Sequence, residues 1–195
     1  MSQERSTYAA AQSAILAFGA NIRSNSGGPA QTIAAATEAL ASRGMRIIRM
    51  SRLYSTPCMP AGSGPDYVNA ICEVDTQAPP EDVLAALHAV EEAFGRTREG
   101  RWAARGLDID LIAYGDQVCP DLATYIAWRD LPFEDQRTRA PAQLILPHPR
   151  IADRAFVLIP LAEILPDWRH PISGLTVRQM LEALPESDKT PVKPL

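Results

Sequence analysis

Two aspartates, Asp108 and Asp110, stand two residues apart in a run that is otherwise apolar. Side chains at alternate positions of a β-strand share a face, so a strand here presents both carboxylates together. Two such charges repel unless a cation or a shared proton relieves them, and paired carboxylates beside phosphates suit Mg²⁺. Taken alone, the pair fits a solvated acidic strand face slightly better than a metal site.

The residues just before this run add a second kind of chemistry. Four arginines, a tryptophan and two glycines lie there: Arg96, Arg98, Arg101, Arg105, Trp102, Gly95 and Gly100. Guanidinium groups bind phosphates in a bidentate manner, so arginines beside paired carboxylates provide what a triphosphate–metal complex requires. The glycines favour a mobile segment, and we expect a lid over the phosphates. The alternative is a solvated basic loop that pairs with Glu99 or the aspartates.

Two further groups could contact a ligand. Tyr67 and Asn69 fall on one face of a strand with alternating polarity, where a ring and an amide could stack on and hydrogen-bond a flat heterocycle. Alone, such a pair is more often simply surface. His148 lies between two prolines, in a rigid segment that cannot be helical. A loop histidine without a function is the alternative there, and we interpret His88 and His170 as structural.

Composition limits the class of protein. The 195 residues are 46% hydrophobic and 22% charged, which is typical of one soluble domain, and the net charge of -4 argues against nucleic-acid binding. The only lysines are Lys189 and Lys193, so the body of the chain has no P-loop lysine or lysine nucleophile. No secretory leader, disulfide pattern or ~20-residue apolar run is present, so we expect a cytoplasmic protein that binds no membrane.

The elements that must position these residues follow from periodicity. The sequence predicts strand 14–18, helix 29–43, strand 45–54, strand 67–76, helix 79–94 and strand 107–114. This order predicts an α+β fold of the ferredoxin-like, split βαβ type with an antiparallel sheet, followed by additional C-terminal helices at 154–165 and 176–184. We expect a single domain at 13–185 with an irregular insertion at about 115–146, and flexible tails at 1–12 and 186–195.

Five short motifs in this order resemble the signature of the 6-hydroxymethyl-7,8-dihydropterin pyrophosphokinases, a folate-pathway family. They are F-G-A-N at 18–21, Y-S-T-P at 54–57, D-Y-V-N-A at 66–70, R-W-A-A-R-G-L-D-I-D-L-I at 101–112, and L-P-H-P-R at 146–150 with R-A-F at 154–156. Each motif is weak alone, whereas five in order are specific, and together they span roughly 15–166.

The resemblance implies transfer of pyrophosphate from ATP to the hydroxymethyl group of the reduced pterin, with release of AMP. It implies that Asp108 and Asp110 bind two Mg²⁺ ions and that Arg96 and Arg98 act with them in catalysis. The ATP-binding positions would be Glu91, Arg98, Trp102, Arg105, His148 and Arg154. The pterin-binding positions would be Thr56, Pro57, Met59, Tyr67, Asn69 and Phe156.

Two alternatives remain open at this point: a ferredoxin-like regulatory module that binds a small molecule, and a different Mg²⁺-dependent phosphoryl transferase on the same fold. The carboxylate pair and four arginines together disfavour the first. AMP as product, in place of ADP, would exclude the second. We expect a monomer. The insertion at 115–146 is longer than is usual in the family, and the sequence predicts no role for it.

Overall fold

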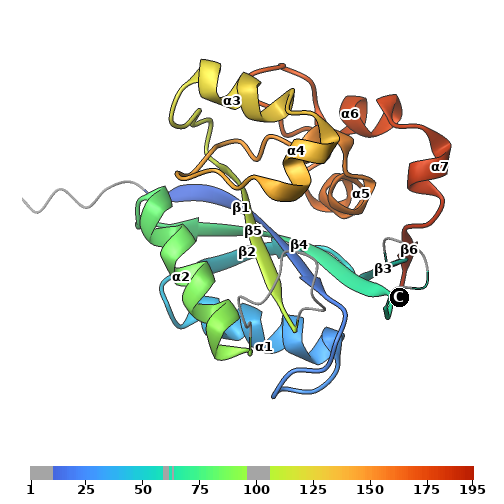
Figure 1. Ribbon diagram of the computed structural model, residues 1–195. Helices are drawn as coiled ribbons and strands as arrows, with labels where there is room; N and C mark the ends of the chain where they lie inside the picture. Colours follow the sequence, from blue (N-terminus) through green and yellow to red (C-terminus); the bar gives the residue numbers. More distant parts are fainter. Residues whose placement is uncertain (1–10, 59–61, 63, 96–105) are drawn as a thin grey trace, which may run out of the picture.

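The computed structural model describes residues 11–58, 62, 64–95 and 106–195 (Figure 1). The principal elements are β1 (Gln12–Ala20), α1 (Pro29–Ala41), β2 (Arg46–Met50), β3 (Tyr54–Thr56), β4 (Tyr67–Thr76), α2 (Pro80–Ala93) and β5 (Asp108–Tyr114). They are followed by α3 (Leu122–Arg129), α4 (Phe133–Thr138), α5 (Ala155–Ile164), α6 (Val177–Ala183), α7 (Glu186–Lys189) and β6 (Lys193–Pro194). None of the helices in these ranges has the length and apolar character that a membrane crossing requires.

The strands form one antiparallel sheet in the order β5-β1-β4-β3-β6, and β2 also pairs with β4. β2 and β3 both pair with β4, and residues 51–53 separate them. The strand predicted at 45–54 is therefore present in two pieces. At the break, Ser51 N–H donates to Ile71 O and Ile71 N–H donates to Ser51 Oγ, each at 2.9 Å. The side chain therefore continues the ladder, and the predicted ferredoxin-like α+β fold is confirmed.

Helices cover both faces of the sheet: α1 and α2 lie on one face, and α3 to α6 lie on the other (Figure 1). β1 is buried on both sides, as its uniformly apolar sequence predicts. Leu16 and Phe18 pack with Ile33 of α1 and Leu87 of α2. On the opposite face Ile15 belongs to a second core that α5 and α6 complete.

A β-bulge changes which residues of β5 face each core. Leu16 is opposite Leu111, whereas Ile15 is opposite Ala113, so Ile112 is an extra residue on β5. As a result Ala113 joins Ile112 in the core of α5 and α6. Unbroken alternation along 107–114 predicts Ala113 on the face of Leu111 and Tyr114 on the face of Asp110, and both predictions are wrong because of the bulge. Asp108 and Asp110 precede the bulge and keep the face that the sequence predicts for them.

The insertion at 115–146 is more regular than predicted, because it contains α3 and α4. Asp121 caps α3, its side chain accepting from Thr124 N–H at 2.8 Å. Two backbone hydrogen bonds of 2.9 Å between Cys119 and Leu146 close the base of the insertion. The segment therefore leaves the sheet and returns to it at a defined point.

The C-terminal residues expected to be a flexible tail instead form α7 and β6. Lys193 lies opposite Ser55 in the β3–β6 pairing, and Val192 packs against Tyr54 and Ala155. β3 would otherwise be an edge strand with unpaired backbone groups, which explains why the chain end adds a strand there. The expectation was wrong because it relied on the polar composition of the tail, whereas the single residue Val192 provides the apolar contact with the rest of the domain.

Val192→Ala should lower the free energy of unfolding by about 1.5 kcal/mol, because two buried methyl groups are removed. Val192 is 9% exposed, whereas Leu195 in the same tail is 69% exposed, so Leu195→Ala should change stability little. Urea denaturation of both variants checks this expectation. Equal effects of the two substitutions would show that the chain end does not pack on β3.

Candidate active site

Three neighbouring strands bring the polar residues of the sequence motifs together at one end of the sheet. Gly19 of β1 lies opposite Asn69 of β4 on one side and opposite Asp108 of β5 on the other. Strands are about 4.8 Å apart, so Asn69 and Asp108 lie on one face about 10 Å apart, with only the glycine between them. Ala17 lies opposite Asp110 in the same way. Gly19 and Ala17 have small side chains or none, so they form a shallow surface, here called the floor, beside the Asn69 amide and the two carboxylates.

A cavity of about 630 Å³ adjoins this floor. Its walls come from α2, β5, the insertion and the segment that follows the insertion. Five residues predicted to bind ATP or metal line it: Glu91, Asp108, Asp110, His148 and Arg154. The fold therefore gathers into one cavity residues that are more than sixty positions apart in the chain.

Asp108 and Asp110 are both partly exposed on the cavity side of β5. Arg154 Nη1 lies 3.7 Å from Asp110 Oδ2, and its guanidinium carbon lies 5.7 Å from the centre of the Phe156 ring. Among the described residues no group of three or more histidine, cysteine or acidic side chains could hold a metal. A cation at this pair would complete its coordination with water and ligand oxygens, which is the behaviour of Mg²⁺.

Glu91 positions the strand that carries these carboxylates. Its side chain is 1% exposed, and Oε1 accepts from the backbone N–H of Ile109 at 2.7 Å. β5 is the edge strand on this side of the sheet, so this N–H, which lies between Asp108 and Asp110, would otherwise lack a strand partner. The buried carboxylate of Glu91 therefore holds the backbone that carries Asp108 and Asp110, and it also lines the cavity.

His148 is held as a neutral hydrogen-bond donor. Its Nδ1 accepts from the backbone N–H of Arg150 at 3.1 Å, which places the ring proton on Nε2. His148 is half-buried and lines the cavity. Burial, aided by the positive charges of Arg154 and Arg150 and opposed by Asp153, lowers the pKa of His148 to about 3. At neutral pH the ring can donate one hydrogen bond from Nε2 but carries no charge.

The residues predicted to bind the heterocycle lie beside the cavity. Asn69 Nδ2 donates to Thr56 Oγ1 at 2.8 Å, and Thr56 lies opposite Tyr67 in the β3–β4 pairing. Asn69 is 6% exposed and its amide is held by this contact, whereas Pro57 is exposed. Phe156, on the first turn of α5, is 38% exposed. None of these five residues lines the 630 Å³ cavity. Asn69, Tyr67 and Thr56 lie on the β4 side of Gly19, whereas the ring of Phe156 contacts Arg154, the partner of Asp110.

Five predicted site residues lie outside the described part of the chain: Met59, Arg96, Arg98, Trp102 and Arg105. Their assignments, and the proposed lid, therefore remain predictions from the sequence.

Other residues of the site were not identified from the sequence. Gly19 was quoted only as part of a motif. A glycine in an otherwise apolar strand often marks a place where a ligand approaches the backbone closely, and this pattern could have identified it. His88, interpreted as structural, has an exposed side chain on the cavity wall. Arg150 lines the cavity, pairs with Asp153, and buries an Nε without a hydrogen-bond partner among the described atoms. His170 is structural as predicted, since it is buried with Nε2 3.1 Å from Tyr125 Oη.

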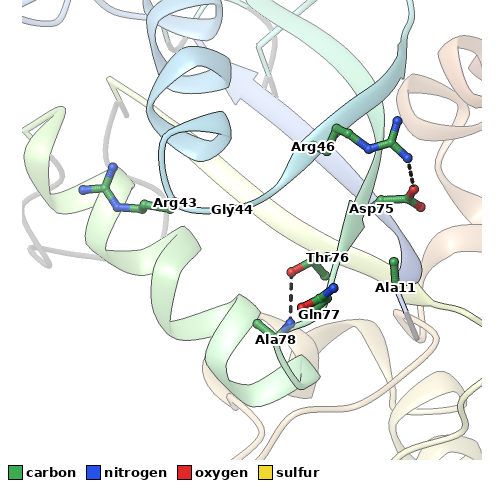
Figure 2. A pocket seen from close by; sticks show the side chains of 8 residues that line it. All are labelled: Ala11, Arg43, Gly44, Arg46, Asp75, Thr76, Gln77 and Ala78. Carbon is green, nitrogen blue, oxygen red and sulfur yellow. Dashed lines mark hydrogen bonds and ion pairs between the residues drawn. The ribbon is translucent and has the colours of Figure 1, made fainter. Parts of the chain in front are cut away.

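A second hollow, of about 380 Å³, lies at the opposite end of the sheet (Figure 2). Arg46 in its wall pairs with Asp75, and Thr76 Oγ1 accepts from Ala78 N–H at 3.2 Å (Figure 2). Arg46, Asp75 and Thr76 thus already have partners within the hollow or beside it, and its wall contains a single carboxylate. It offers no counterpart to the paired aspartates, so the first cavity is the candidate active site.

A family model for 7,8-dihydro-6-hydroxymethylpterin-pyrophosphokinase (HPPK) matches residues 15–166, which include the five cavity-lining residues that the sequence predicts to bind ATP or metal. The chain belongs to this family. It is 38% identical over 130 residues to the 2-amino-4-hydroxy-6-hydroxymethyldihydropteridine pyrophosphokinase of Synechocystis sp., covering 67% of this chain and 56% of that protein. It is also 38% identical over 176 residues to the protein of the same name from Methylorubrum extorquens, covering 89% and 94%.

The fold is shared with a solved structure of Plasmodium falciparum HPPK-DHPS, with a TM-score of 0.64 and 15% identity. That match covers 91% of this chain and 45% of the Plasmodium chain, so it supports the fold alone. The chain spans about half the length of the Synechocystis and Plasmodium relatives that it matches. Residues beyond 166, which include α6, α7 and β6, lie outside the range that the family model matches.

Gly19→Val should leave the fold intact and abolish the family's reaction. An added Cβ would meet Asn69 Oδ1 at 3.5 Å, an ordinary contact, and Gly19 does not need a positive φ. A β-branched residue also suits a strand, but its methyl groups would rise between Asn69 and Asp108. Thermal unfolding and a turnover assay check this. Wild-type turnover by a folded Gly19→Val variant would show that no ligand crosses this floor.

Acid should destabilise the protein in part through His148. Its folded pKa is about 3 against an ordinary 6.5, so between these values the unfolded chain binds a proton that the folded chain does not. The free energy of unfolding should therefore fall as the pH is lowered from about 6.5 towards 3. His148→Asn keeps an acceptor for Arg150 N–H but does not titrate. The difference between the free energies of unfolding of wild type and this variant should therefore shrink as the pH is lowered. Parallel pH profiles of the two proteins would contradict this.

Proposed function

We propose that this chain transfers the pyrophosphoryl group of ATP to the hydroxymethyl group of 6-hydroxymethyl-7,8-dihydropterin and releases AMP, in folate biosynthesis. Family membership supports the reaction class. The observation that carries the proposal is the register that sets Asn69 and Asp108 on either side of Gly19. In that register, a group suited to a heterocycle lies about 10 Å from a group suited to a metal–phosphate complex, and the strand residue between them has no side chain.

ATP with Mg²⁺ occupies the 630 Å³ cavity in this proposal. Asp108 and Asp110 would hold the magnesium, with two ions expected, and bound magnesium supplies charge neutralisation at the phosphate oxygens. Arg154 is 3.7 Å from Asp110, too long for a strong hydrogen bond, so its guanidinium can turn to a phosphate once a cation takes the carboxylate. His148 would donate from Nε2 to a nucleotide oxygen, a role that requires the neutral ring.

The pterin would lie on the Asn69 side of Gly19. Tyr67 and Phe156 are the rings available to stack on it, while Asn69 and Thr56 offer amide and hydroxyl groups to its edge. Because Asn69 Nδ2 already donates to Thr56, the free acceptor Oδ1 is the atom presented to donors of the ring. Pro57 and Met59 would complete the wall.

In the reaction the hydroxymethyl oxygen attacks the β-phosphorus in line, and the bond from that phosphorus to the oxygen bridging to the α-phosphorus breaks. The hydroxyl proton is lost to solvent, and AMP leaves with the bridging oxygen. No strong general base is required, because positioning of the two substrates and neutralisation of charge lower most of the barrier. Arg96 and Arg98 are proposed to act on the phosphates in the reacting state. A monomer in the cytoplasm is our expectation for the working form.

Asp108→Asn and Asp110→Asn should each lower AMP formation on the order of a thousandfold at saturating Mg²⁺, since each removes a charge that holds the metal. Asp116→Asn, an exposed aspartate two residues beyond β5 that does not line the cavity, is the matched control and should keep full activity. Chromatography of the products of ATP and the reduced pterin measures this. ADP as the product, or near-normal AMP release by either variant, would reject the proposal.

A further inference from the structure

The insertion at 115–146 forms part of the nucleotide cavity. Trp128, at the end of α3, and Arg139, directly after α4, line it, as do Pro141 to Ile145 on the way back to the sheet. The insertion returns at Leu146, two residues before His148, so its base is joined to the phosphate-side wall. A segment to which the sequence assigns no role therefore supplies one side of the proposed ATP site.

The cavity is charged at one end and largely apolar at the other. Glu91, beside Asp108 and Asp110, marks the charged end. Leu84 lies seven residues earlier on α2, which is about 10 Å along the helix axis. The insertion starts near this second end, because Tyr114 Oη at the end of β5 donates to Ala78 O, just before α2, at 2.7 Å. A nucleotide with its phosphates at the aspartates would extend its base towards Leu84 and the insertion.

Trp128 is held in place and holds Arg139 in turn. Tyr125, one turn earlier in α3, is 2% exposed and contacts buried His170, which anchors the helix. Trp128 is half-buried, and the guanidinium carbon of Arg139 lies 5.8 Å from the centre of its ring. This distance is typical of a cation–π contact. The indole thus supports a planar cation on the cavity wall.

Among the described side chains, Arg139 differs from Arg150 and Arg154, the other guanidinium groups of the cavity, in having no acidic partner. Arg150 pairs with Asp153 and Arg154 with Asp110, whereas among the side chains that the structure describes no carboxylate pairs with Arg139. Its side chain is exposed, so both its charge and its outer face are available to a ligand.

We infer that Trp128 and Arg139 form a subsite for the purine of ATP: the base stacks on the guanidinium plane of Arg139, and Trp128 is the positioning residue that orients this plane. Arginine is suited to this role because its planar group stacks on aromatic surfaces, which a lysine ammonium cannot do. The apolar side chains of Leu84, Leu144 and Ile145, which line the same cavity, suit a base better than a phosphate. This inference rests on the proposed function, because it takes the cavity as the ATP site.

Calorimetry with the α,β-methylene analogue of MgATP, which cannot undergo the transfer, tests the inference in the full chain. Arg139→Ala should weaken binding about tenfold, and Arg139→Lys should restore little of it. Trp128→Ala should weaken binding less than Arg139→Ala, and the double variant should bind no more weakly than Arg139→Ala alone, because the indole acts through the guanidinium. Arg129→Ala, in the same insertion but paired with Asp130 and away from the cavity, should bind as wild type does.

The outcomes separate this inference from the proposed function. Unchanged affinity in Arg139→Ala, while the wild-type protein binds the analogue and forms AMP, overturns the subsite alone. Absence of AMP formation by the wild-type protein overturns the proposed function instead. Ribose 5-triphosphate, which has no base, should lose little affinity in Arg139→Ala. An equal loss for both ligands would make Arg139 a phosphate ligand and reject the purine assignment. Additive losses in the double variant would reject the positioning role of Trp128.

Discussion

The pairing of β1 between β4 and β5 is the constraint on which the site depends. Antiparallel register places directly opposed residues on one face, so Asn69, Gly19 and Asp108 form a row across three strands. A shift of one residue in either pairing would turn Asn69 or Asp108 towards the core of α1 and α2. The hydrophobic residues that alternate with them, Phe18 and Ile109 among them, therefore determine the site as well as the core, because their burial specifies the register.

Several of the polar contacts around the site hold backbone or side chains in place and leave other atoms free for ligands. Glu91 is nearly fully buried to hold one N–H of β5, and Asn69 holds Thr56 while keeping its carbonyl oxygen. His148 uses Nδ1 for the backbone and keeps Nε2 for the cavity. Such preorganisation suits a reaction in which positioning lowers most of the barrier, because a ligand need not order these groups on binding.

The parts added to the common fold lie at opposite ends of the site. The insertion lines the 630 Å³ cavity, where we propose that ATP binds, and the chain end adds β6 to β3, the strand that carries Thr56. Both additions bury surfaces that the sheet would leave open. The insertion forms a wall of the cavity, and β6 pairs with the edge of β3. In each case a few anchoring side chains, Tyr125 in the insertion and Val192 in the tail, secure an otherwise polar segment.

The sequence alone determined the order of the elements from β1 to β5, apart from the break between β2 and β3. It also determined the face of β5 that carries Asp108 and Asp110, the helix that begins after the Thr176–Gln179 capping box, and, through five ordered motifs, the family. These features depend on local periodicity and residue type, which a single chain displays directly. Only the tertiary structure decided the bulge at Ile112, the ordered chain end, the second function of Glu91 as a strand support, and the convergence of Trp128 and Arg139 on the cavity. Each of these depends on contacts between residues distant in the sequence, where composition gives no signal of which partner will be near.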